Sequence, residues 1–299
     1  MSQSPQPIPF DRALLDRRRQ RWLAKNRQPG VEFLLEAAAD ELYDRLAVVE
    51  RRFPVAVDLG GTFGQMARRL RDGGRCDSVV RIERLGFLLG GDPLAVVGDE
   101  EFLPLKPESV DLVASCLSMQ FVNDVPGMLA QIRRALRPDG LFTAALFGGE
   151  TLHELRASLL QAESEVFGGV SPRVLPFAEV REAGALLQRA GFALPVADIE
   201  RLTVRYDTLF DLARDLRGMG AANVLAERSR RPASRRFFLR AAEIYAERYA
   251  DPDGRIRASF DVLYLSGWAP HESQQKPLRP GSARTSLAAA LKDRSSDLS

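Results

Sequence analysis

The sequence predicts an α/β fold with a doubly wound, mostly parallel sheet of seven strands. Three observations carry this prediction. Short β-rich runs alternate with helical patterns in the first half of the chain, the first run leads into a glycine-rich turn, and two further strand-like runs close the second half. Strands that alternate with helices favour a sheet covered on both faces, and 299 residues are enough to bury one large core.

The first half of the chain begins with a predicted helix and continues with strands and helices in alternation. Residues 32–51 place apolar side chains at helical spacing, and Pro54 ends the pattern. Residues 65–71 and 125–136 are predicted helices, and residues 137–140 (Arg-Pro-Asp-Gly) predict a turn after the second. The predicted strands are 55–59, 78–82, 94–97, 110–114 and 141–147.

The second half is richer in helices. Amphipathic patterns predict four of them, and two strand-like runs complete the seven-stranded sheet. The predicted helices are 151–167, 177–190, 209–217 and 235–250, and the predicted strands are 193–206 and 259–268. These helices are insertions before the last strand.

Charge and composition exclude several classes of protein. The formal net charge is only +2, so no global basic field favours binding to nucleic acid. Residues 10–30 are locally rich in arginine, which predicts a solvated helix face or, alternatively, a contact surface for an acidic partner or the inner membrane. Two cysteines, Cys76 and Cys116, cannot form a disulfide framework. Without an apolar leader or spanning segment, we expect a cytoplasmic bacterial protein, peripheral to the inner membrane if that basic surface binds it.

The glycine-rich turn is the first candidate binding site. Residues 55–64 read Val-Ala-Val-Asp-Leu-Gly-Gly-Thr-Phe-Gly, and a helix is predicted to follow. Such a strand–turn–helix presents backbone N–H groups to a nucleotide cofactor. The candidate ligands are Asp58, Gly60, Gly61, Thr62 and Gly64. The loop resembles the D-x-G-x-G-x-G loop of S-adenosylmethionine-dependent methyltransferases, except that Thr62 stands at the central glycine position.

Residues that follow the other strands complete this candidate site. In a doubly wound sheet, ligands bind beyond the carboxyl ends of the strands. Glu83 follows the second strand at the distance expected for an acid that binds the ribose hydroxyls, although Arg81 is an alternative occupant of that position. Asp99 and Glu100 follow the third strand, where methyltransferases carry an acid for the adenine amino group. Ser115 follows the fourth strand.

The sequence assigns no catalytic residue and no metal site. Its only histidines, His153 and His271, lack a companion carboxylate at ligand spacing. Together with Arg156, they are candidates for contact with a partner.

Several segments resemble one particular family, the methyltransferase-like assembly factor of respiratory complex I and its bacterial relatives. The most specific segments are 147–156 (Phe-Gly-Gly-Glu-Thr-Leu-His-Glu-Leu-Arg) and 267–274 (Gly-Trp-Ala-Pro-His-Glu-Ser-Gln). The other matching segments are 10–12 with its arginine-rich continuation to Trp22, 26–27, 99–104, 117–124, 136–140, 171–172 and 215–220.

This resemblance implies a class I methyltransferase fold and a role in complex I assembly. In the mitochondrial relative the reaction is hydroxylation of an arginine on the iron–sulfur subunit next to the quinone site. More distant kin methylate the carboxyl group of malonyl-acyl carrier protein. The chain departs from the family pattern at Thr62, at the uncertain acid of the second strand, and at Gln120-Phe121, where His-Trp is usual.

These departures gather at the cofactor cleft, so the hypothesis is an assembly protein, with an iron–sulfur subunit as substrate, whose S-adenosylmethionine binding is weakened or lost. Two alternatives stay open, namely an ordinary methyltransferase of a small molecule or an acyl-carrier carboxyl, and a non-catalytic chaperone. The predicted organisation is disorder over 1–9, a single domain over 10–275 and a flexible tail over 276–299. Within the domain, 10–54 is an N-terminal helical segment, 55–147 the cofactor-binding half and 148–275 the helical substrate half.

Overall fold

The computed structural model of the chain describes residues 8–23, 30 and 32–275. The predicted tail at 276–299, most of the predicted disorder at 1–9 and part of the basic segment at 10–30 therefore lie outside the described residues. The division of residues 10–275 into three parts stays a prediction.

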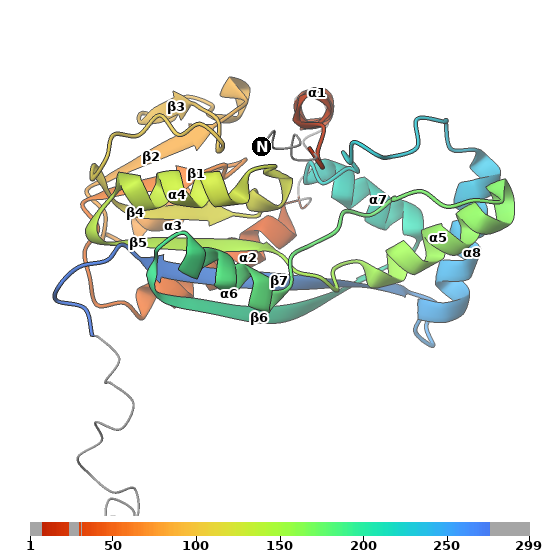
Figure 1. Cartoon of the computed structure of the whole chain (residues 1–299). Coiled ribbons are helices and arrows are strands. Elements are labelled where there is room, and N and C mark those ends of the chain that lie inside the picture. The colour runs from red at the N-terminus through yellow and green to blue at the C-terminus, as the bar shows by residue number, and fades with distance from the viewer. Residues whose placement is uncertain (1–7, 24–29, 31, 276–299) are drawn as a thin grey trace, which may run out of the picture.

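A seven-stranded sheet forms the centre of the molecule, with the strand order β3-β2-β1-β4-β5-β7-β6 (Figure 1). The first five strands are parallel, and β7 runs antiparallel to both of its neighbours. The predicted doubly wound sheet is confirmed. The strands are β1 (Val55–Leu59), β2 (Ser78–Glu83), β3 (Ala95–Val97), β4 (Val110–Cys116), β5 (Leu136–Phe147), β6 (Ala193–Tyr206) and β7 (Ile256–Trp268).

Helices cover both faces of this sheet because each face of a parallel sheet is apolar. Helices α2 and α3 pack on one face, and α4 and α6 pack on the other. Each pair buries its own apolar core against the sheet. Helices α5, α7 and α8 gather beyond the carboxyl ends of the parallel strands (Figure 1). The helices are α1 (Arg12–Leu23), α2 (Phe33–Ala47), α3 (Gln65–Asp72), α4 (Val125–Ala135), α5 (His153–Phe167), α6 (Val180–Arg189), α7 (Leu209–Gly218) and α8 (Arg235–Tyr249). None of those in the described ranges is long and apolar enough to cross a bilayer.

The turn predicted at residues 137–140 is wrong, because β5 begins at Leu136 and runs through these residues. The pairing of β5 with β4 shifts register there, and Asp139 adopts a positive φ of 64°. The segment after β7 holds this irregular stretch in place. The Asp139 N–H donates to the Ala269 carbonyl (3.1 Å), and the Ala269 N–H donates to the Gly140 carbonyl (2.8 Å). The turn chemistry thus forms a bulge within the strand.

Helix α1 lies across the carboxyl edge of the sheet, above the point where β4 ends (Figure 1). A small third core fixes it there. That core joins Phe10 and Leu15 to Phe121, which follows β4, and to Val224 and Leu225 from the segment after α7. The N-terminal segment therefore covers the edge at which ligands bind in this class of fold.

Candidate functional site

The glycine-rich turn between β1 and α3 is tightly packed and strained at one residue. Gly60 and Gly64 adopt positive φ angles of 69° and 73°, which glycine tolerates. Thr62 also adopts a positive φ, 32°, although a β-branched residue resists that conformation. Its side chain is buried. The loop therefore adopts positive φ angles at Gly60, Thr62 and Gly64, although a threonine stands at its central position.

Asp58 lies beneath this turn in a buried position. Its carboxylate accepts from the Ala67 N–H (3.3 Å) and fills the space beside Gly61, where a Cβ would stand 2.3 Å from both carboxylate oxygens. Its Oδ1 atom has no hydrogen-bond partner. Burial raises the pKa of Asp58 to about 6, and the charge of Arg81, 3.8 Å away, acts against that rise. Asp58 is thus a buried acid that organises the loop from below.

The structure places the two candidates of the second strand differently. The Arg81 guanidinium donates to the Thr62 carbonyl (3.2 Å) and lies against Gly64, so it supports the loop. Glu83 is the last residue of β2 and is buried, and its Oε1 accepts from the N–H groups of Arg84 (2.9 Å) and Leu85 (3.4 Å). Its Oε2 is buried without a partner, so it is an open acceptor at the carboxyl end of β2.

Asp99 and Glu100 face Arg12 of helix α1. The Arg12 guanidinium bonds to the Asp99 carboxylate (2.6 Å), to Glu100 and to Glu101 (3.0 Å). Burial raises the pKa of Glu100, and Arg12 acts against that rise. Arg84, which donates to Asp16 (2.6 Å), adds a second tie between α1 and this edge. Sequence reasoning missed the role of Arg12, whose only signal was its place in a family-specific segment.

Ser115 and Ser118 connect the end of β4 to the glycine-rich turn. The two hydroxyl groups lie 2.9 Å apart, and Ser118 also donates to the Leu59 carbonyl (3.4 Å). A Cβ on Gly60 would stand 2.5 Å from the Ser118 Oγ and 3.0 Å from the Glu100 Oε1. Residues from the ends of β1, β3 and β4 therefore meet around Gly60, and Ser118 joins them without having been predicted.

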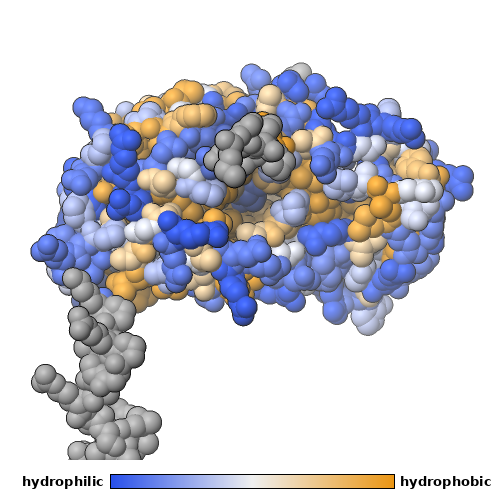
Figure 2. Space-filling model, in the orientation of Figure 1, coloured by the Kyte–Doolittle hydropathy of each residue, from blue (hydrophilic) through white to orange (hydrophobic). Residues whose placement is uncertain are grey.

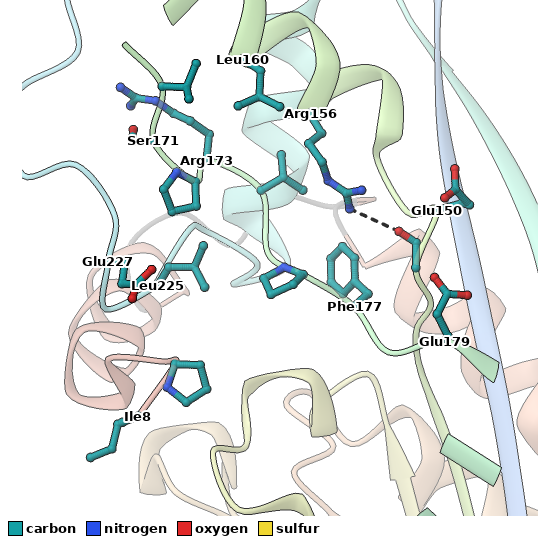
Figure 3. A pocket seen from close by; sticks show the side chains of 16 residues that line it. Ile8, Glu150, Arg156, Leu160, Ser171, Arg173, Phe177, Glu179, Leu225 and Glu227 are labelled. Carbon is teal, nitrogen blue, oxygen red and sulfur yellow. Dashed lines mark hydrogen bonds between the residues drawn. The ribbon is translucent and has the colours of Figure 1, made fainter. Parts of the chain in front are cut away.

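A cavity of about 750 Å³ opens beside the end of β5, and Figure 3 shows its lining. Arg156 of α5 points into it and donates to the Gly149 and Thr151 carbonyls (both 3.3 Å). Within the described chain, no carboxylate pairs with this guanidinium. The walls combine carboxylates and apolar groups from the β5–α5 connection, α5, the segment before α6 and the segment after α7. They include Ile8, Glu150, Leu160, Val174, Phe177, Glu179, Leu225 and Glu227.

The other candidates for partner contact lie outside this cavity lining. The His153 ring nitrogen lies 3.2 Å from the Glu150 carbonyl, at the start of α5. His271 is exposed, and its ring lies 2.7 Å from the Ser273 hydroxyl. Among the residues that the structure describes, no group of three or more acids, histidines and cysteines is arranged to hold a metal ion.

Comparison with known proteins places this geometry in context. The sequence model of a family described as "Methyltransferase domain" matches residues 57–144, which include the glycine-rich turn and the ends of β2, β3 and β4. Solved methyltransferase-like structures share the fold. A methyltransferase from Bacillus halodurans has a TM-score of 0.55 at 14% identity and covers 79% of this chain and 100% of its own. The YcgJ protein from Bacillus subtilis has a TM-score of 0.54 at 14% identity, with coverage of 78% and 99%.

Curated relatives match the chain far beyond that region. The mitochondrial arginine-hydroxylase NDUFAF5 of Danio rerio is 40% identical over 293 residues, which cover 93% of this chain and 88% of the relative. The human protein of the same name is 38% identical, with coverage of 93% and 82%. The malonyl-[acyl-carrier protein] O-methyltransferase of Halorhodospira halophila is 32% identical, with coverage of 92% and 96%. Each similarity includes the helical region that walls the cavity.

Proposed function

The chain belongs to the class I methyltransferase family that includes the arginine-hydroxylase NDUFAF5 proteins, and from this premise we propose that it hydroxylates an arginine of an iron–sulfur subunit during assembly of respiratory complex I. The supporting observation is the extent of the similarity. Identity of 40% spans 93% of the chain, whereas the general methyltransferase domain accounts only for residues 57–144. The shared remainder contains the cavity at the end of β5.

The cleft residues suit one end of S-adenosylmethionine. In our proposal Glu83 accepts from the ribose hydroxyls through its open Oε2 atom. Asp99 and Glu100 lie beside the adenine. The backbone of Gly60, Gly61 and Gly64 lines the approach, and Asp58 and Ser115 hold that backbone in shape from below and beside it. When bound, the cofactor supplies an activated sulfonium group.

Thr62 sets the strength of that binding in our proposal. The loop keeps its positive φ angles, but a buried β-branched side chain stands where the family pattern has hydrogen only. Since glycine there lets the cofactor approach the backbone closely, we propose that S-adenosylmethionine binds more weakly than in relatives with the complete motif.

The cavity at the end of β5 is the proposed substrate site. Glu150, Glu179 and Glu227 on its walls suit a cationic side chain, and Phe177 offers an aromatic face on which a guanidinium can stack. Arg173 is neutralised by Glu163 (2.6 Å), so the charge that opposes a cationic ligand is that of Arg156, which the three glutamates outnumber. Hydroxylation inserts one oxygen atom into a C–H bond of the substrate arginine. With dioxygen as the oxidant, the second oxygen atom leaves as water, and a separate two-electron donor supplies the electrons together with two protons.

Mass spectrometry of complex I tests this function. The iron–sulfur subunit is purified from the source bacterium, from a strain without the gene, and from that strain complemented with the wild-type gene. We expect one arginine peptide to carry the mass of one added oxygen atom, to lose it on deletion and to regain it on complementation. An unmodified subunit in the wild type, or a modification that survives deletion, would contradict the proposal.

The same measurement separates the alternatives. The similarity to the Halorhodospira enzyme, which covers 96% of that protein, favours methylation of an acyl-carrier carboxyl as the second candidate. Arg156, with backbone carbonyls as its partners, would suit such a carboxylate. A methyl group on the carrier protein, with an unmodified subunit, would establish that reaction. Lost complex I activity without either modification would establish the chaperone.

We place this activity in the cytoplasm, with residues 10–30 as the surface that meets an acidic partner or the inner membrane. The exposed Arg17 and Arg21 are available for that contact. Arg12 and Arg19 are buried against the rest of the molecule.

A further inference from the structure

Helix α1 turns two arginines toward the carboxyl edge of the sheet. Arg12, Leu15, Asp16 and Arg19 recur at a spacing of three or four residues and so share one helix face. Leu15 on this face is 2% exposed and belongs to the small core that holds α1 in place. The helix therefore carries both guanidinium groups into the covered edge.

The two arginines differ in their partners. Arg12 is paired with three carboxylates. Arg19 is only 5% exposed, and its Nε atom is buried without a partner. Among the described residues it makes no hydrogen bond and no ion pair. Its contacts are the Phe121 ring, whose centroid is 5.1 Å from the guanidinium carbon, and Gly220, on which a Cβ would stand 3.0 Å from the Arg19 Nε.

Arg19 has no direct ion pair within the part of the chain that the structure describes, although the charges of Asp16 and Glu100 act on it from a longer distance. Removing a charge from water is costly unless the group is paired and hydrogen-bonded, and a cation–π contact with Phe121 compensates only in part. A buried guanidinium whose Nε lacks an acceptor is therefore a position at which an anionic ligand can bind.

The residues around Arg19 place it beside the proposed cofactor site. Phe121 follows β4, directly after the serines that contact the glycine-rich turn. Burial raises the pKa of Glu100, and the charges of Arg12 and Arg19 both act against that rise, so both arginines face the acid beside Gly60. Arg19 thus lies at the same edge of the sheet as Glu83. Glu83 offers an open carboxylate oxygen there, and Arg19 offers a guanidinium group.

We propose that Arg19 binds the carboxylate of the methionine moiety of S-adenosylmethionine. This inference rests on the cofactor binding proposed above. The cofactor carries one carboxylate, on the end opposite its ribose and adenine. Glu83 accepts hydrogen bonds from the ribose hydroxyls in our proposal. Arg19 is a buried cation on α1, the helix that covers this edge. Arg19 also offers a means of retaining the cofactor where Thr62 weakens the loop.

Ligand truncation combined with substitution tests the proposal. Wild-type protein, Arg19→Met and Arg17→Met are titrated calorimetrically with S-adenosylmethionine and with methylthioadenosine, which lacks the amino-carboxylate tail. Arg17 is an exposed arginine of the same helix, so its variant controls for the lost charge. We expect Arg19→Met to weaken S-adenosylmethionine at least about tenfold and to leave methylthioadenosine unchanged. Arg17→Met should change neither.

Stability of the ligand-free protein gives a second readout. If Arg19 is held for a ligand, Arg19→Met removes a buried charge that has no direct ion pair among the described residues and raises the midpoint of thermal unfolding, while Arg17→Met leaves it unchanged. A purely structural arginine predicts a lower midpoint for Arg19→Met, and that result would overturn the inference.

The outcomes separate this inference from the proposed cofactor site. If the wild type binds S-adenosylmethionine and Arg19→Met binds it equally well, the role of Arg19 is refuted and the cofactor site stands. Equal weakening of both ligands by Arg19→Met also refutes it, because the tail would not be the recognised group. If the wild type binds neither ligand, both proposals fall.

Discussion

Thr62 shows that a threonine can adopt the backbone conformation of a glycine within a tightly packed turn. Its φ of 32° lies in the left-handed region, where a non-glycine residue costs about 1 kcal/mol or more. The Arg81 guanidinium and the buried Asp58 hold the loop from the other side. The surrounding structure therefore imposes the glycine conformation on a threonine.

We predict that Thr62→Gly tightens S-adenosylmethionine binding by about tenfold, since it removes both the backbone strain and the obstructing side chain. Thr62→Ala is the matched control. It retains a Cβ but removes the branch, and it should give an intermediate affinity. Calorimetric titration measures all three proteins, and identical dissociation constants would show that Thr62 does not limit binding.

Asp58 should make stability depend on pH. Its pKa is about 6 in the folded protein and 3.8 in the unfolded chain, so the folded state holds the proton more tightly. Its contribution is therefore greatest at low pH and falls as pH rises from about 4 to about 6, by about 3 kcal/mol.

We predict that Asp58→Asn removes this dependence. The difference in unfolding free energy between variant and wild type should move in favour of the variant between pH 4 and pH 6 and stay constant above that range. Urea unfolding at a series of pH values measures it. A difference that is independent of pH would show that folding does not shift the pKa of Asp58.

Among the elements, helix α1 depends most on charge. Its inward face is short of apolar residues, and Arg12 and Asp16 tie it to the β3 end and to Arg84 through ion pairs. These pairs are largely buried, so removing one partner leaves uncompensated charge behind. The acids after β3 thus serve the covering helix as well as the proposed adenine site.

We predict that Arg12→Gln destabilises the protein by about 3 kcal/mol, because Glu100 and its neighbours lose their buried counter-ion. Amide hydrogen exchange in α1 should quicken more than exchange in α4. Arg17→Gln removes the same charge from an exposed position of α1 and should change neither quantity. Unaltered exchange in α1 of the Arg12 variant would show that the apolar contacts of Leu15 are sufficient.

At the scale of the whole molecule, ligand binding and stability are linked. The proposed cofactor site lies between the strand ends and helix α1, which covers them, so a bound cofactor would contact both. A ligand that binds only the folded state at a hundredfold excess over its dissociation constant stabilises by about 2.7 kcal/mol. We predict that saturating S-adenosylmethionine raises the thermal midpoint by several degrees. Calorimetric scans with and without ligand measure this, and an unchanged midpoint at high ligand concentration would show that the ligand does not bind the folded state in preference to the unfolded chain.

The family-specific segments also act at this scale. Glu154 is buried and accepts from the Ser259 N–H (3.2 Å) and hydroxyl (2.6 Å), so it joins α5 to β7. Gln274 donates to the Asp139 carboxylate and to the Ala269 carbonyl (both 2.8 Å). It thereby joins the start of β5 to the segment that follows β7. These segments hold distant parts of the chain together, and only Gly149, Glu150 and Arg156 of the first of them line the cavity.

The sequence by itself determined the sheet, its strands and the turn that follows β1, because periodicity and turn chemistry are local properties. It also indicated the acids and serine at the strand ends. It misjudged residues 137–140, whose pairing with Ala269 arises from a segment far along the chain. Only the tertiary structure decided which arginines are compensated, since Arg12 and Arg19 look alike in sequence and differ through the elements packed against them. The cavity beside β5 was likewise decided by packing, because its walls come from segments that meet only in the folded chain.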